Sequence, residues 1–172
     1  MFKSQEFNPP SLRMMEQLDI NLRKLVKDYE GPKLVIVAVG GGLSLARIGT
    51  IPGCSRILEA IYLPYSDASI NSFLGYTNTE KAVSANRAAN LYSAAKSKHI
   101  SSRVISITAA LTSSRHRKGM NHAWIDVEGT LYHKILYKET EQEWNNWNSC
   151  NILPYQRYIQ DIEISEFCLN LL

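Results

Sequence analysis

The chain has 172 residues, of which 45% are hydrophobic and 20% are charged, and its formal net charge is +3. This length and composition are typical of a single globular domain, here expected to extend over residues 1–172. No apolar run approaches the roughly 20 residues that a membrane-spanning helix needs. We therefore expect no membrane partner.

The cysteines are odd in number, widely spaced and without a CxxC pair; they are Cys54, Cys150 and Cys168. This spacing predicts neither a disulfide framework nor a zinc site. Free thiols persist in reducing compartments, so a cytoplasmic location is expected.

Positive charge gathers in the middle of the chain, because no Asp or Glu occurs from 82 to 125. The densest basic stretch, SSRHRKG at 113–119, is suited to binding an anion. The chain carries no helix-turn-helix, zinc-finger or RNA-binding signature, so we expect no nucleic-acid partner.

Hydrophobic periodicity predicts the elements in chain order. The first half should contain a helix over 11–31, a buried strand over 34–39, a short helix from 43 to about 48, a strand over 57–63 and a short helix over 66–74. The second half should contain a helix over 84–98, a strand over 103–109, a hairpin of 122–127 and 131–137, and helices over 138–151 and from 155. This order indicates an α/β fold, a three-layer α/β/α single domain with a mixed sheet ending in a β-hairpin.

Polar groups or glycines follow each of the first three expected strands. They are Gly40, Gly41 and Gly42, then Tyr65 and Ser66, then Thr108 with the basic loop that contains Ser114, Arg115 and Lys118. Ligands of open α/β sheets bind outside the carboxyl ends of the strands, so these groups could share one crevice. A glycine turn before a helix presents N–H groups to an anion, although a tight turn alone also requires glycine.

Familiar catalytic and metal-binding motifs are missing. The chain has no P-loop, GxSxG or HExxH pattern, and the three glycines do not continue into GxGxxG. Its histidines lack metal-ligand spacing, and His122 and His133 face each other only in some hairpin registers. We expect no metal and no cofactor.

Two stretches, GGLSLARIGTIPGCS at Gly41–Ser55 and PYSDAS at Pro64–Ser69, resemble the CinA C-terminal domain, the nicotinamide-nucleotide amidohydrolase family. The resemblance covers residues 33–137 and leaves 138–172 as a divergent helical region. It implies a three-layer α/β/α fold and hydrolysis of the carboxamide of nicotinamide mononucleotide without a metal.

The family's catalytic residues are missing from this pattern. Its nucleophilic serine falls on Ala38, and the lysine of its Y-S-N-E-A-K segment falls on Ile70. A covalent amidase needs an oxygen nucleophile and a group that accepts its proton, and these two side chains supply neither. The resemblance therefore implies a retained binding half without the family's serine mechanism.

Longer matches relate the chain to a divergent branch, in which a CinA-like domain precedes a nucleotidylyltransferase-like domain. They are PGCSRILEAIYLPYSDAS at Pro52–Ser69 and ALTSSRHRKG at Ala110–Gly119. If this resemblance holds, the branch's own site comprises Glu59, Tyr65, Ser66, Ser114, Arg115 and Lys118.

Three functional hypotheses follow. In the first, a phosphorylated ligand such as a pyridine mononucleotide binds with its phosphate on Gly40–Gly42 and on Arg115 and Lys118, and with Tyr65 against its ring or ribose. In the second, the chain is a working enzyme with relocated catalytic residues, for which Glu59, Ser66 and His122 are candidates.

Glu59 motivates the second hypothesis, because a carboxylate in the middle of a strand is rarely buried without a partner. A salt bridge from Glu59 to Arg47 or Arg56 is the structural alternative. The third hypothesis is a non-catalytic interaction subunit, with a homo-oligomer as one form of it and with the C-terminal aromatics and the tail after Pro154 as its interface.

Overall fold

The computed structural model describes residues 10–172, so residues 1–9 of the expected domain lie outside the described part. The helices are α1 (Pro10–Asp28), α2 (Asp67–Leu74), α3 (Ala85–Lys98), α4 (Glu141–Ser149) and α5 (Leu153–Leu169), with the 3-10 helices η1 (Leu43–Thr50) and η2 (Cys54–Arg56). The strands are β1 (Leu34–Val39), β2 (Leu58–Tyr62), β3 (Arg103–Ala110), β4 (His122–Val127) and β5 (Thr130–Ile135).

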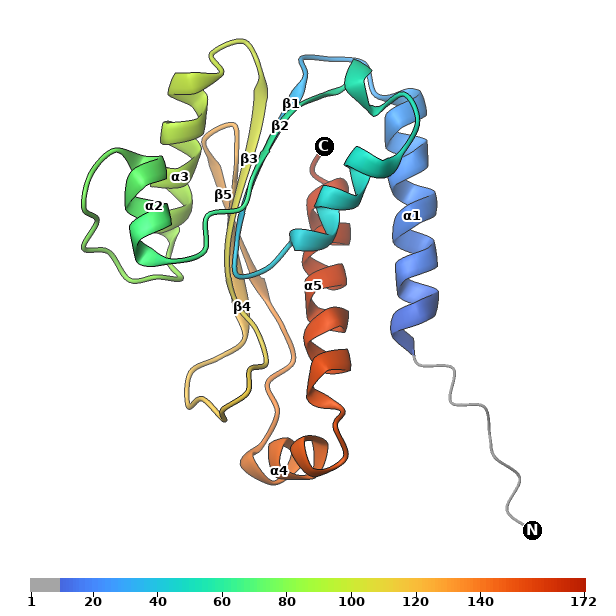
Figure 1. Ribbon diagram of the computed structural model, residues 1–172, viewed down its shortest axis with the longest axis vertical. Coiled ribbons are helices and arrows are strands. Elements are labelled where there is room, and N and C mark those ends of the chain that lie inside the picture. The colour runs from blue at the N-terminus through green and yellow to red at the C-terminus, as the bar shows by residue number, and fades with distance from the viewer. Residues whose placement is uncertain (1–9) are drawn as a thin grey trace.

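The strands form one five-stranded sheet in the order β2-β1-β3-β4-β5. The first three are parallel, and β4 and β5 form an antiparallel hairpin. The helices α2 and α3 lie on one face of the sheet, while α1, η1 and α5 lie on the other (Figure 1). The predicted three-layer fold with a mixed sheet and a terminal hairpin is confirmed.

The central strand β1 explains the unbroken apolar run in the sequence. Leu34, Ile36 and Ala38 join the core shared with α1, η1 and α5, whereas Val35, Val37 and Val39 join the core shared with α2 and α3. A strand that is covered on both faces needs apolar residues at every position.

The C-terminal region is part of this core and is not an appended tail. In α5, Ile162, Ile164 and Cys168 are fully buried against the sheet. Of the C-terminal residues expected at an interface, Phe167 and Leu171 are partly buried against this core, whereas Tyr158 is 56% exposed. Trimming after Pro154 would therefore remove a layer of the core, and an interface in this region stays a prediction.

Two helix boundaries differ from the prediction for local reasons. Helix α4 begins at Glu141 and not at 138, because the Thr140 side chain accepts a hydrogen bond from Glu143 N and the Glu143 carboxylate accepts one from Thr140 N. Helix α5 already includes Pro154, since the first turn of a helix does not need that N–H group. None of the helices within residues 10–172 is long and apolar enough to cross a membrane.

Candidate functional site

The glycine turn is shaped by its close approach to β3. Gly40 and Gly42 have φ angles of 77° and 75°, in the left-handed region. A Cβ atom at Gly40 would lie 2.5 Å from the carbonyl oxygen of Ala109, and one at Gly42 would lie 2.6 Å from Cδ1 of Ile107. Packing inside the chain is therefore sufficient to require glycine at both positions.

A carboxylate of the chain itself occupies the start of η1. Asp161 on α5 accepts hydrogen bonds from Leu43 N at 2.9 Å, from Ser44 N at 2.8 Å and from Ser44 Oγ at 2.5 Å. We call this set of bonds the Asp161 latch. Negative charge is stabilised at such a position, where an anionic ligand was expected. A phosphate at these two N–H groups would have to displace Asp161.

A hollow of about 440 Å³ lies beside this turn, between α1, η1 and α5. It is lined by Met15, Gly40, Leu43, Ser44, Arg47, Leu111, Pro154, Arg157, Tyr158 and Asp161. We call it the turn hollow. Arg157 is not among the binding residues predicted from the sequence.

The two arginines of the turn hollow differ in how they are bonded. Arg47 forms a bidentate ion pair with Asp19, with both N–O distances 2.7 Å. Arg157 donates to the carbonyl oxygen of Thr112 at 2.9 Å, and no carboxylate within the described residues lies within 4 Å of its guanidinium. Of the two arginines, Arg157 is therefore the one without a carboxylate partner in the described part of the chain.

A second hollow of about 340 Å³ adjoins the first, and both are lined by Pro154 and Arg157. Its other lining residues are Thr112, Ser113, Ser114, Asn148, Asn151 and Leu153. The predicted residue Ser114 thus lies at the rim of the same crevice. Arg115 and Lys118 are exposed on the loop that forms this rim.

The loop is held by a buried polar network beneath it. Asn121 Nδ2 donates to Glu139 Oε2 at 2.8 Å and to the carbonyl oxygen of Tyr137 at 3.0 Å, and Asn121 Oδ1 accepts from Arg117 at 2.7 Å. Thr112 joins through its hydroxyl, which lies 3.2 Å from Glu139 Oε2. Because burial disfavours an isolated charge, it lowers the pKa of Arg117. The network orders one wall of the crevice from inside.

Glu139 should stabilise the fold only above acidic pH. Burial acts to raise the pKa of this carboxyl, but hydrogen bonds from its own backbone, Lys138 and Asn121, with the charge of Lys138, outweigh burial and hold the pKa below its usual value. A carboxyl whose pKa is lower in the folded chain contributes stability above its unfolded pKa of about 4.5 and loses it as pH falls.

We therefore expect the unfolding free energies of wild type and Glu139→Gln to differ at neutral pH and to converge below about pH 4. Urea unfolding at several pH values measures this difference. A gap that widens as pH falls would contradict the ion-pair role of Glu139.

The other predicted binding residues lie near the carboxyl ends of β2 and β3 but outside the turn hollow. Tyr65 is 68% exposed, and the Ser66 hydroxyl oxygen caps α2 by accepting from Ser69 N at 3.1 Å. Thr108 is buried on the α3 side, where its hydroxyl donates to the carbonyl oxygen of Ala82 at 2.7 Å. None of these three residues lines the turn hollow.

The positions of the family's nucleophile and lysine belong to different cores. Ala38 is buried with α1, η1 and α5, and Ile70 is buried with α2 and α3. Both are apolar side chains in packed surroundings.

Glu59 does not have the setting that was expected. Its side chain is 41% exposed, so it is not a buried carboxylate in need of a partner. The basic side chain beside it is His99, whose Nδ1 lies 3.9 Å from Glu59 Oε1. Arg47 pairs with Asp19, and Arg56 donates to backbone carbonyls such as that of Tyr29. The expected salt bridge from Glu59 to Arg47 or Arg56 is wrong.

Two of the candidate catalytic residues, Glu59 and His122, are too far apart to act together as acid and base. Their strands, β2 and β4, are separated by β1 and β3, which places them roughly 14 Å apart at the spacing of neighbouring strands. His122 Nδ1 instead lies 2.9 Å from His133 Nε2. Burial, helped by the charges of His133, Lys81 and Arg117, lowers the pKa of His122. Within residues 10–172, no group of three or more potential metal ligands comes together.

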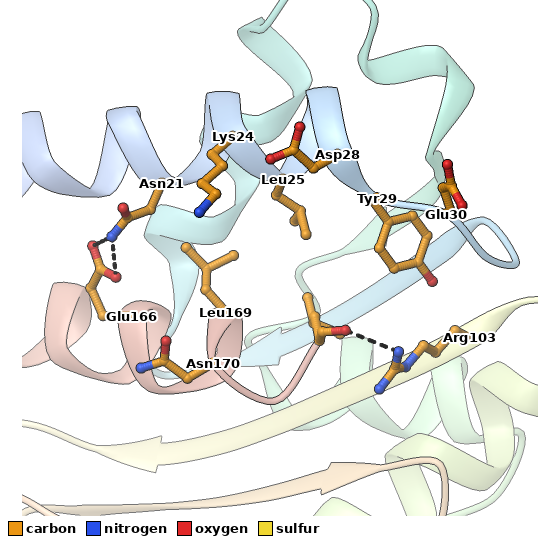
Figure 2. Close-up of a pocket in the computed structure, with 11 residues that line it drawn as sticks. Asn21, Lys24, Leu25, Asp28, Tyr29, Glu30, Arg103, Glu166, Leu169 and Asn170 are labelled. Carbon is orange, nitrogen blue, oxygen red and sulfur yellow. Dashed lines mark hydrogen bonds between the residues drawn. The ribbon is translucent and has the colours of Figure 1, made fainter.

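A hollow of about 480 Å³ lies near the amino ends of the parallel strands, between the C-terminal ends of α1 and α5 (Figure 2). Lys24, Asp28, Glu30 and Glu166 bring charges of both signs to it. Arg103 donates to the backbone oxygens of Leu171 and Leu172 at 3.0 and 3.1 Å. None of the residues predicted from sequence lies there.

Several solved structures are similar to this chain over nearly its whole length. The chain is similar to the competence/damage-inducible protein CihA from Agrobacterium tumefaciens, with 17% identity and a TM-score of 0.60 over 91% of this chain and 96% of that one. It is also similar to CinA superfamily proteins from Escherichia coli (14% identity, TM-score 0.55, 95% and 94% coverage) and Klebsiella pneumoniae (10%, 0.58, 95% and 100%).

No known protein-family pattern matches the sequence, and no curated protein matches it. The likeness to these solved structures shows that the three-layer domain, with its glycine turn at the carboxyl ends of the strands, has a CinA-like fold. At these identities the likeness defines the fold of the chain.

Proposed function

We propose that this CinA-like domain binds a phosphorylated small molecule, such as a pyridine mononucleotide, and does not perform the family's serine-dependent amidase reaction. The observation that carries the proposal is the turn hollow, in which Arg157 presents a cation that has no carboxylate partner among residues 10–172. Arginine is well suited to phosphate because its planar guanidinium can donate two parallel hydrogen bonds.

The Asp161 latch refines where the phosphate would lie. Because Asp161 already accepts from Leu43 N and Ser44 N, we assign the phosphate to Arg157 and not to these N–H groups. Tyr158 also lines the turn hollow, so it replaces Tyr65 as the side chain expected against a ring or ribose. Arg115 and Lys118, on the adjacent loop, would add attraction at longer range.

The absence of amidase chemistry follows from the side chains at the positions that resemble the family's motif. Ala38 has no oxygen to attack a carboxamide, and Ile70 cannot accept a proton. Incubation with nicotinamide mononucleotide should therefore release no ammonia.

Calorimetric titration with nicotinamide and nicotinate mononucleotides tests the binding. We expect Arg157→Ala to weaken binding about 10- to 100-fold, the loss typical of a hydrogen-bonded charge. Arg115→Ala should weaken it less, because an exposed charge is screened by solvent. Arg23→Ala, on the exposed surface of α1, is the matched control and should bind like wild type. No heat with either mononucleotide at millimolar concentration would overturn the proposal.

A further inference from the structure

Within residues 10–172, the strand β5 forms one edge of the sheet, with β4 as its single neighbour. The hydrogen bond from Leu136 N to the carbonyl oxygen of Asn121, 3.0 Å long, shows which backbone groups face β4. Because bonding direction alternates along an antiparallel strand, the even-numbered residues bond to β4. Leu131, His133 and Ile135 therefore direct their N–H and C=O groups to the open edge, which is a template for another strand.

The side chains of these residues make the edge apolar and ordered. Leu131 is 42% exposed and Ile135 is 61% exposed, and both lie on the same face as His133. The His133 ring stacks on Trp124 at 4.1 Å and contacts His122, so its position is fixed. Lysine often protects an open edge, but Lys134 directs its ammonium toward the Phe167 ring, 5.7 Å from the ring centre.

We propose that two copies of this chain pair through β5, antiparallel and centred on His133. In this register Leu131 of one copy lies opposite Ile135 of the other, so each exposed apolar side chain covers another. The three outward N–H groups of each copy meet the three outward C=O groups of its partner. Glu128 before β5 and Lys138 after it come to the same level at each end, and each already has a partner within its own copy, Lys96 and Glu139 respectively.

The neighbouring register and the other sheet edge are poorer choices. A register centred on Tyr132 would place Leu131 opposite His133 and Ile135 opposite Gly129, which has no side chain. At the other edge, β2 carries the exposed charge of Glu59 and is soon followed by Pro64, which cannot donate a hydrogen bond. Pairing of β2 with β5 would not close on itself, whereas two β5 edges form a closed two-fold contact.

Light scattering of the full chain at tens of micromolar, at a pH where imidazoles are neutral, tests the pairing. We expect a mass of twice 19.5 kDa. Ile135→Lys and Leu131→Pro should both give monomers, the first by placing a charge in the apolar pair and the second by removing an outward N–H group. Ile100→Lys, at a position 78% exposed and outside β5, is the matched control and should remain dimeric. A monomeric wild type, or a dimer unaffected by Ile135→Lys, would overturn the proposal.

Engineered disulfides test the register, in a Cys150→Ser background that removes an exposed thiol. Opposed residues in this arrangement have Cα atoms about 5.5 Å apart, within disulfide reach. Equal residues at 131 or at 135 would be roughly 14 Å apart. A mixture of Leu131→Cys and Ile135→Cys chains should therefore cross-link on oxidation, while each variant alone should not. Cross-linking of one variant alone, or none in the mixture of folded chains, would contradict the register.

Discussion

Asp161→Ala should lower the free energy of unfolding by about 3 kcal/mol, because three donors in the Asp161 latch lose their acceptor. The carboxylate also joins α5 to the start of η1 across 117 positions of sequence, so its loss should loosen one layer of the fold. In a chain of this length a loss of that size lowers the melting temperature by roughly 6–12 °C. Thermal and urea unfolding of both proteins measure the effect.

Two variants separate the latch from general effects on α5. Asp161→Asn keeps a carbonyl acceptor and should cost less than Asp161→Ala. Glu163→Ala, two positions along the same helix, should change stability by no more than about 0.5 kcal/mol, as is usual for a partly exposed surface position. Equal stability of wild type and Asp161→Ala would show that the three hydrogen bonds contribute nothing.

Asn121→Ala should cost about 2–3 kcal/mol, since Asn121 is fully buried and connects the loop after β3 with the segment after β5. Its removal leaves Glu139 with fewer donors in a site closed to water. A buried carboxylate without enough partners is strongly destabilising. Urea unfolding gives the stability, and amide hydrogen exchange in loop 111–120 should accelerate.

Thr112→Val is the graded control for the same network. It removes one hydroxyl, at 3.2 Å from Glu139 and 3.3 Å from Asn121, and should cost about 1 kcal/mol. If Asn121→Ala cost no more than Thr112→Val, the buried network would not be what holds the loop.

The sequence predicts the fold well because its strongest signals are local. The unbroken apolar run at Leu34–Val39 is typical of a strand that is covered on both faces. The structure places this strand at the centre of the parallel part of the sheet. Ser66 and Ser84 cap α2 and α3, and each cap is a local signal because the side chain and the N–H group that it accepts from are three residues apart.

The site is harder to predict because its partners are distant in sequence. Asp161 meets Ser44, and Arg157 meets Thr112, through the packing of α5 on the sheet. The sequence carries one signal for the role of Asp161. This acidic residue lies three positions before Ile164 and seven before Cys168, on the face of α5 that is buried. Glu59 was expected to be buried and is exposed, because β2 lies at the edge of the sheet, where a residue in a strand can face solvent.

We propose above that a phosphorylated ligand binds in the turn hollow beside Arg157. Titration of isotope-labelled protein with nicotinate mononucleotide, followed by amide chemical shifts, tests it most directly. We expect the largest shifts at Ser44, Leu111, Arg157 and Tyr158, and their loss in Arg157→Ala. Shifts gathered around Tyr65 and α2, or no shifts at millimolar ligand, would contradict the account.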